Sequence, residues 1–216
     1  LAVEEISRIC PSIGVTMSVS NSVCCWPIAR FGSEEIKRQF LPDLASGKTL
    51  GGFCFTEAGS GSDAGAMLTS ARRDGDDYVL DGAKVWITNA GFAGTFVVMA
   101  KTDPAAGKRG ISAFVVDATA PGIDIGRPEE KLGLRASVTA ASTGKPFATA
   151  TYNARESSMA ATSEISNCMA MTAGSPCCTR LWAVPEKGSF LPERAPSQAL
   201  STTRRRLSSS CRMVPR

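Results

Sequence analysis

The stretch GGFCFTEAGSGSDAGA, residues 51–66, separates two kinds of sequence. Before it, apolar residues recur at helical spacing, and after it they alternate as in β-strands. The stretch itself is a short apolar strand that runs into a turn rich in glycine and hydroxyl groups. Glycine has no Cβ, so such a turn can approach a phosphate or an aromatic heterocycle closely. From residue chemistry alone, a ligand-binding loop and a solvated connection capped by Ser62 and Asp63 are equally good interpretations.

The glycine spacing also fits a dinucleotide-binding fingerprint. Gly59, Gly61 and Ala64 match G-x-G-x-x-A, and Asp81 follows roughly twenty positions later. A Rossmann loop must open a helix whose N-terminus faces the pyrophosphate. Here the loop runs into MLTSARRDGDDYVLDG, which alternates and contains a turn. The context therefore argues against a Rossmann site, and no G-K-[ST] follows at the spacing of a P-loop.

The N-terminal part predicts helices. Residues 1–10 form a helical stripe that Pro11 interrupts, and residues 12–32 predict a buried helix that ends near Gly32. A third helix begins at Ser33, a residue suited to the N-cap. Its apolar face consists of Ile36, Phe40, Leu41 and Leu44, and Gly47 ends it.

After Gly51 the pattern predicts strands. RRDGDD, residues 72–77, indicates a hairpin turn, and a second turn is expected at Asp81–Gly82. Further strands are predicted over residues 94–102 and 108–118. The fold class is therefore α+β: an N-terminal helical segment, then an antiparallel β-barrel-like domain.

Composition excludes several classes of function. The chain has no histidine, which excludes histidine triads and histidine metal ligands on it. Its eight cysteines include no C-x-x-C, so the sequence favours neither a zinc site nor a disulfide scaffold. Unpaired cysteines favour a reducing compartment. We expect four of the cysteines to be small buried apolar residues: Cys10, Cys24, Cys25 and Cys54.

No apolar run reaches the ~18 residues of a membrane span, and the first ten residues do not resemble a signal or transit peptide. Because no initiator Met is present, we expect the natural N-terminus to be missing.

The pattern changes from Val138 onward. Ten of the 24 basic residues and only four of the 20 acidic ones lie there, and the 79 residues include one isoleucine. Such a composition buries too little apolar surface to offset chain entropy, so we expect an irregular or disordered tail. The basic run TTRRRLSSSCR has no aromatic platform beside it, which argues against nucleic-acid binding.

Two segments carry a resemblance to a family. GGFCFTEAGSGSDAGA is similar to the flavin loop of acyl-CoA dehydrogenases, F-x-x-T-E-P-x-x-G-S-D, with Ala58 in place of the proline. LDGAKVWITNAGFA, residues 80–93, resembles that family's second flavin segment, N-G-x-K-x-W-I-T-N. Residues 31–51 and 108–137 resemble the regions before and after them, so the likeness runs from Leu1 to about Ser137.

The resemblance implies FAD as cofactor and assigns roles by position. Thr56 would hydrogen-bond the flavin ring, Trp86 would pack against the isoalloxazine, and Thr88 would hydrogen-bond near N5 or O4. Ser62 would reach the FAD phosphate or the pantetheine arm of the acyl-CoA. The residues expected to bind FAD are Phe53, Phe55, Thr56, Gly61, Ser62, Trp86, Ile87 and Thr88. Without the resemblance, the favoured interpretation is that Trp86 is an ordinary core residue and Thr88 an ordinary strand residue, and the resemblance reverses that preference.

The family's reaction is α,β-dehydrogenation of an acyl-CoA thioester to a trans-2-enoyl-CoA, in a homo-oligomer, typically a tetramer, that passes electrons to an electron-transfer flavoprotein. Its base is a glutamate in or near a C-terminal helical domain that nothing here resembles. Glu129 and Glu130 match another part of the family, so we assign no catalytic residue. An acyl-CoA oxidase-like flavoenzyme and a non-catalytic binding remnant remain alternatives. Mitochondrial matrix and bacterial cytoplasm both fit.

Three regions follow: a partial helical domain at 1–48, a flavin-binding β domain at 49–137, and an aberrant tail at 138–216 without the family's helical bundle. The abrupt change near Ser137 favours a reading-frame shift or a gene-model error, with a genuinely divergent tail as the alternative. Lys108 and Arg109 are interpreted as a solvated charged turn rather than a CoA phosphate site.

Overall fold

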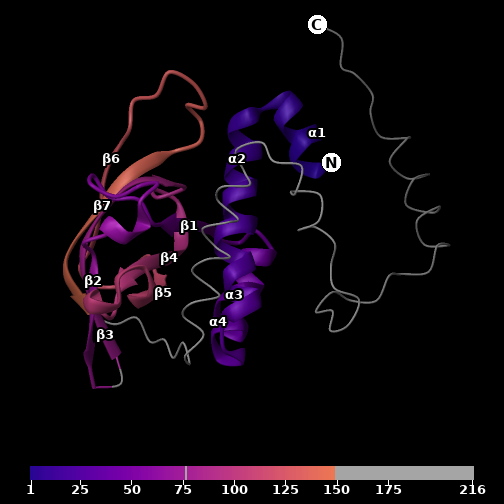
Figure 1. Cartoon of the computed structure of the whole chain (residues 1–216). Helices are drawn as coiled ribbons and strands as arrows, with labels where there is room; N and C mark the ends of the chain where they lie inside the picture. The colour runs from indigo at the N-terminus through magenta and orange to yellow at the C-terminus, as the bar shows by residue number, and fades with distance from the viewer. Residues whose placement is uncertain (76, 149–216) are drawn as a thin grey trace, which may run out of the picture. The chain divides into compact units, whose positions relative to one another are not determined.

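The computed structural model describes residues 1–75 and 77–148, with side chains as far as Ser142 (Figure 1). Four α-helices come first, then seven strands. The helices and the described strands belong to one compact unit. The predicted α+β class, with helices preceding a β-sheet, is therefore confirmed.

The helical part follows its local sequence signals. Cys10 is extended, and it separates α1 (Ala2–Ile9) from α2 (Pro11–Val19), which begins with proline at a position where no intrahelical N–H is needed. A six-residue π-helical segment (Ser20–Cys25) connects α2 to α3 (Trp26–Phe31). The backbone is thus helical from residue 11 to residue 31, close to the predicted range 12–32, and residues 20–25 of it are π-helical.

Helix α4 (Glu34–Ala45) is capped as the sequence predicts. The Ser33 side chain accepts a hydrogen bond from the Ile36 N–H at 3.3 Å, and Glu34 and Glu35 lie at the positive end of the helix dipole. Gly47 follows with φ of 75°, a conformation that glycine adopts at little cost. Ile36 and Leu44 are buried.

One sheet contains all seven strands, in the order β1-β4-β2-β3-β7-β6, with β5 paired to β4. Most neighbours are antiparallel, but β1 and β2 both pair parallel with β4, so the sheet is mixed, and it does not close into a barrel. The strands are β1 (Leu50–Cys54), β2 (Ser70–Asp74), β3 (Asp77–Thr88), β4 (Ala93–Lys101), β5 (Ile111–Asp117), β6 (Ile123–Pro128) and β7 (Thr139–Ala148).

Strand β4 is buried on both faces. Phe96, Val98 and Ala100 point into a cluster with Phe114 of β5, whereas Val97 and Met99 point into a cluster that also contains helical residues. Successive side chains of a strand point to opposite faces, so an uninterrupted apolar run is what a strand covered on both sides requires.

The helices join the sheet through polar contacts. The Ser20 hydroxyl accepts a hydrogen bond from the Gly51 N–H at 3.1 Å. The Asn89 side-chain amide donates to the Gly51 carbonyl at 2.9 Å and to the Thr16 carbonyl at 3.3 Å. A Cβ on Gly51 would lie 2.4 Å from the Cys24 sulfur, so only glycine fits there.

Two local expectations are corrected by the structure. No turn forms at Asp81–Gly82, because β3 runs through both residues and pairs with β2 and β7. Gly82 instead permits a close approach, since a Cβ there would lie 2.4 Å from the Thr69 hydroxyl oxygen. The hairpin at RRDGDD is confirmed, with Asp74 opposite Asp77 and Gly75 at φ of 64°.

The second correction concerns the tail. We expected irregular chain from Val138, but Thr139–Ala148 forms β7, which pairs antiparallel with β3 and with β6. Backbone pairing on both sides holds this segment in spite of its weak apolar pattern. The rest of the tail, including the basic run, lies outside the described residues.

Among the cysteines expected to be buried, Cys24 and Cys54 are, whereas Cys10 and Cys25 are half-buried. Burial raises the pKa of both the Cys24 and the Cys54 thiols, the latter to about 12. Both therefore act as neutral, apolar groups at ordinary pH.

Candidate functional site

The glycine-rich turn is held by its own backbone. Glu57 and Ser60 exchange two backbone hydrogen bonds, at 2.7 and 3.2 Å, which makes a tight turn. The Ser60 hydroxyl donates to the Asp63 carbonyl, and the Asp63 carboxylate caps a short 3₁₀ turn (Ala64–Ala66) by accepting from the Gly65 N–H. Ser60 is buried, and the parts of the turn exposed to solvent are residues 58–59 and 61–63.

Strand β3 is irregular where the second predicted flavin segment lies. Its pairing with β7 shifts register between Lys84 and Ile87. Trp86, inside this bulge, has φ of 57°, a strained conformation for a residue with a bulky side chain. The bulge turns the Trp86 indole outward, 65% exposed, while Ile87 next to it is fully buried.

The two predicted segments meet at this bulge. The Val85 N–H donates to the Thr56 carbonyl at 2.8 Å, so the residue before Trp86 is bonded directly to the start of the glycine-rich turn. Thr56 is half-buried and Trp86 is exposed. These segments lie about thirty positions apart in sequence, and the fold places them side by side.

The eight predicted cofactor residues fall into three groups. Phe53 and Phe55 are buried in the cluster shared with the helices, and their rings stack at 5.7 Å between centroids. Ile87 is buried in the cluster on the opposite side of the sheet. Thr56 and Thr88 are half-buried, and the exposed ones are Gly61, Ser62 and Trp86.

A buried ion pair beside the site was missed by sequence reasoning. Lys84 Nζ lies 2.8 Å from Glu57 Oε1, and the two side chains are only 4% and 7% exposed. Lys84 also donates to the Phe55 carbonyl at 3.2 Å. A usable signal existed, because Leu80, Gly82 and Lys84 share one parity of β3, and a lysine on an inward parity requires an acidic partner.

The Glu57 carboxylate has further donors. Its Oε2 accepts from the Leu68 N–H at 2.6 Å, and its Oε1 accepts from the Thr69 N–H at 2.9 Å and from the Thr69 hydroxyl. Burial alone would raise the pKa of Glu57, but the hydrogen bonds from Lys84, Thr69 and the two backbone amides outweigh it and hold the pKa below its usual range. Burial lowers the pKa of Lys84, and the contact with Glu57 opposes that shift.

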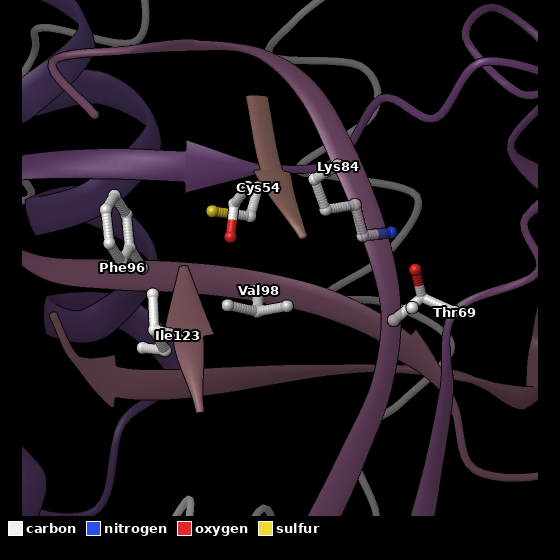
Figure 2. A pocket seen from close by; sticks show the side chains of 8 residues that line it. Cys54, Thr69, Lys84, Phe96, Val98 and Ile123 are labelled. Carbon is white, nitrogen blue, oxygen red and sulfur yellow. The ribbon is translucent and has the colours of Figure 1, made fainter. Parts of the chain in front are cut away.

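A small pocket lies next to this pair (Figure 2). In Figure 2 the Lys84 amine and the Thr69 hydroxyl lie on one side of it, and Phe96, Val98 and Ile123 lie on the other. None of the eight predicted cofactor residues lines the pocket, whose complete lining is Cys54, Thr69, Gly82, Lys84, Phe96, Val98, Ile123 and Ser142. The pocket is therefore separate from the predicted cofactor residues.

Within residues 1–75 and 77–148, no group of acidic and cysteine side chains is placed to hold a metal ion. In the same part of the chain, no helix is long and apolar enough to cross a bilayer.

Comparisons with known proteins identify the family. The N-terminal domain of acyl-CoA dehydrogenases matches residues 1–48, and the middle domain of the same family matches residues 52–145. Together these matches cover most of the described chain. The chain belongs to the acyl-CoA dehydrogenase family.

Individual relatives agree with this assignment. The short-chain specific acyl-CoA dehydrogenase of Bos taurus mitochondria is 52% identical over 140 residues, which are 65% of this chain and 34% of that protein. An acyl-CoA dehydrogenase of Bacillus subtilis is 48% identical over 139 residues, 64% of this chain and 37% of that protein. The chain thus spans about a third of the length of these relatives.

Among solved structures, a glutaryl-CoA dehydrogenase from Mycobacterium smegmatis in complex with FADH2 superposes with a TM-score of 0.61 at 35% identity. The match covers 71% of this chain and 40% of that one. A reduced flavin is thus bound by a relative that shares this fold.

Proposed function

We propose that this chain is the part of an FAD-dependent acyl-CoA dehydrogenase that forms one wall of the flavin site. The observation that carries the proposal is the 2.8 Å hydrogen bond from the Val85 N–H to the Thr56 carbonyl. It sets the two segments that resemble the family's flavin motifs against each other, next to an outward-facing indole. In the longer protein the reaction is α,β-dehydrogenation of an acyl-CoA to a trans-2-enoyl-CoA.

The residues at this surface fit a flavin. An indole that is 65% exposed presents the flat apolar wall that an isoalloxazine ring packs against. A Cβ on Gly59 would meet no atom within 4 Å, and one on Gly61 would meet only the Thr56 methyl at 3.7 Å, so the turn is open toward solvent. Such an open backbone suits close approach by a ring or a phosphate.

Each exposed or half-buried residue then has a role. Trp86 packs against the ring, while Thr56 and Thr88 supply hydrogen-bond donors toward its polar edge. When bound, FAD supplies the chemistry of accepting a hydride from the substrate's β-carbon, and donors aimed at the ring favour its reduced form. Ser62 reaches a phosphate of FAD or the pantetheine arm of the acyl-CoA.

Phe53, Phe55 and Ile87 contribute indirectly. All three are buried in the core, so their role is to fix the backbone on which Thr56 and Trp86 lie. This is a positioning role, and it differs from direct contact with the cofactor.

We assign no base for removal of the α-proton among the described residues, and Glu129 and Glu130 are exposed. We propose that the 216-residue chain retains FAD weakly and does not turn over, and that the base lies in a part of the family's fold that this chain does not match. The partners proposed for the longer enzyme are an acyl-CoA, an electron-transfer flavoprotein and further copies in a homo-oligomer. Mitochondrial and bacterial relatives suggest a mitochondrial matrix or a bacterial cytoplasm.

The test is a titration of the purified chain with FAD, followed by quenching of flavin fluorescence. We expect saturable but weak binding, no stoichiometric flavin after purification, and no bleaching by acyl-CoA. Trp86→Ala should weaken binding about tenfold, equivalent to roughly 1.4 kcal/mol. Phe92→Ala is the matched control, since Phe92 is a similarly exposed aromatic residue, at 69%.

Either of two results contradicts the flavin-site proposal: no flavin binding by the parent chain, or equal binding by the parent and Trp86→Ala. Stoichiometric flavin together with dehydrogenation of an acyl-CoA would contradict the proposed inactivity. Translation of the coding DNA in the other two frames tests the reading-frame hypothesis, which fails if neither frame restores the family's helical C-terminal part.

A further inference from the structure

The loop that begins at Glu57 is closed by one side chain. The Glu57 carboxylate accepts from the backbone N–H groups of Leu68 and Thr69, which lie eleven and twelve positions further along the chain. Between these points most residues are exposed. The loop also contacts the rest of the chain through the Gly65 carbonyl, which accepts from Lys101 Nζ at 3.0 Å, through the exposed Asp63–Lys108 pair and through the buried Met67 side chain. The carboxylate is therefore the tie between the two ends of the glycine-rich loop.

The same carboxylate is tied to β3. Lys84 Nζ lies 2.8 Å from Glu57 Oε1 and also donates to the Phe55 carbonyl. Lys84 is the last residue before the register shift that turns Trp86 outward. A second hydrogen bond, from the Val85 N–H to the Thr56 carbonyl, joins the residue after Lys84 to the residue before Glu57.

We propose that Glu57 and Lys84 are positioning residues that hold the loop 57–69 against the β3 bulge, so that Thr56 and Trp86 form a single preformed surface. This inference rests on the proposed flavin site for its functional meaning. Neither side chain is accessible to a ligand, since both are less than 10% exposed. They act through the backbone that they hold.

The buried pair differs in kind from the other ion pairs of the described chain. Asp43 and Lys48 also lie 2.8 Å apart, but their side chains are 47% and 71% exposed, and they join neighbouring parts of a helix end. A solvated pair of this kind contributes little, whereas removing one partner of a buried pair leaves a charge without compensation. Lys108 and Asp63 connect segments that are also far apart in sequence, but their atoms lie 3.4 Å apart and their side chains are 72% and 68% exposed. Among the ion pairs of the described residues, Glu57–Lys84 alone is both buried and formed between distant segments.

Amide hydrogen exchange on the unliganded full chain tests the inference without flavin. Glu57→Gln leaves one acceptor oxygen and introduces an NH₂ donor, so it cannot accept from both Leu68 and Thr69 while facing Lys84. We expect exchange at Leu68, Thr69 and Val85 to become at least about tenfold faster, in line with the loss of hydrogen bonds to a charged group.

Lys84→Met gives a different pattern. The carboxylate keeps its bonds to Leu68 and Thr69, so these amides should stay more protected than in Glu57→Gln, while the Val85 amide exchanges faster. Glu57→Asp keeps the charge but is one methylene shorter, and it should accelerate exchange at Leu68. Asp43→Asn is the matched control and should leave all three amides unchanged.

Parent-like exchange at Leu68 and Thr69 in both Glu57 variants would overturn the inference. Global unfolding of all three variants at the pair would also overturn it, because the pair would then stabilise the whole domain rather than position the loop.

A titration with FAD separates this inference from the proposed function. Weaker binding by Glu57→Gln and Lys84→Met, with faster loop exchange, supports both. Faster loop exchange with unchanged FAD affinity overturns the link between loop position and flavin. If the parent chain binds no FAD, the proposed function fails, and the exchange pattern still decides whether the pair positions the loop.

Discussion

Strands β3 and β4 belong to one sheet but are built in opposite ways. From Thr95 to Ala100, β4 is buried at every position and regular along its pairing with β5. Strand β3 has exposed and half-buried residues along its length, an inward-facing lysine, a register shift and a tryptophan in a strained conformation. The core depends on β4, and the candidate site depends on β3.

The difference shows that different strands of one sheet can serve stability and ligand binding. An apolar strand covered on both faces has one low-energy register, because any slip would move its side chains to the wrong face. A strand that must present an indole to a ligand departs from that pattern, and local strain is characteristic of functional sites. Substitutions in β4 should therefore alter stability, and substitutions near the β3 bulge should alter binding.

The largest effect is expected from Phe96→Ala in β4. Phe96 is 1% exposed and packs in the apolar cluster that contains Phe114. Truncating it leaves a cavity in that cluster, so the free energy of unfolding should fall by about 3–5 kcal/mol. Urea denaturation followed by far-UV circular dichroism measures it. A loss below roughly 1 kcal/mol would show that β4 is not the main source of stability.

A smaller loss is expected from Gly82→Ala in β3. The new Cβ would lie 2.4 Å from the Thr69 hydroxyl oxygen and 2.8 Å from the Thr69 Cα, so the two strands must separate. The cost is about 1–3 kcal/mol in the same unfolding experiment. Gly133→Ala is the control, because a Cβ there meets no atom within 4 Å, and the two variants should differ clearly.

Acid should remove the contribution of Glu57. Its folded-state pKa lies below the ordinary value of 4.5, so its stabilising effect is fully present above pH 4.5 and is lost as the pH falls through the lower, folded-state pKa. The difference in unfolding free energy between the parent chain and Glu57→Gln should shrink over this acid range. A difference that stays constant down to the acid limit would show that the Glu57 charge does not matter.

The smallest stability effect is expected from Trp86→Ala. Its indole is 65% exposed, so unfolding should change by no more than about 0.5 kcal/mol, even as FAD affinity falls. A loss as large as that of Phe96→Ala would erase the contrast between the two strands.

The parts of the fold that depend on local pattern could be predicted from the sequence. The Ser33 cap, the end of α4 just before Gly47 and the hairpin around Gly75 each depend on a residue and its immediate neighbours. The prediction of a turn at Asp81–Gly82 was wrong, because this glycine allows a close approach to Thr69, a residue that lies next to it only in the folded sheet.

The site was predictable in part. The resemblance located Thr56 and Trp86, and the structure places their segments together. Whether a side chain points outward depends on the bulge after Lys84, and strict alternation would have placed Trp86 inward with Lys84, so sequence period alone could not resolve it. The Glu57–Lys84 pair joins positions 27 residues apart, and only the tertiary fold brings them together. Strand β7 was missed because its support comes from backbone pairing with β3 and β6 rather than from apolar alternation.

The Asn89 amide has a consequence for where this chain can be divided. A single side chain bonds carbonyls at Thr16 and Gly51, which lie 73 and 38 positions away, so the helices and the first strand must assemble together before those bonds can form. The border between the two family domains near residue 50 is therefore not a place where the folded chain separates into independent parts. Separate expression of the two halves would remove the Asn89 bond from the Thr16 carbonyl, which would keep only its helical bond from the Ser20 N–H.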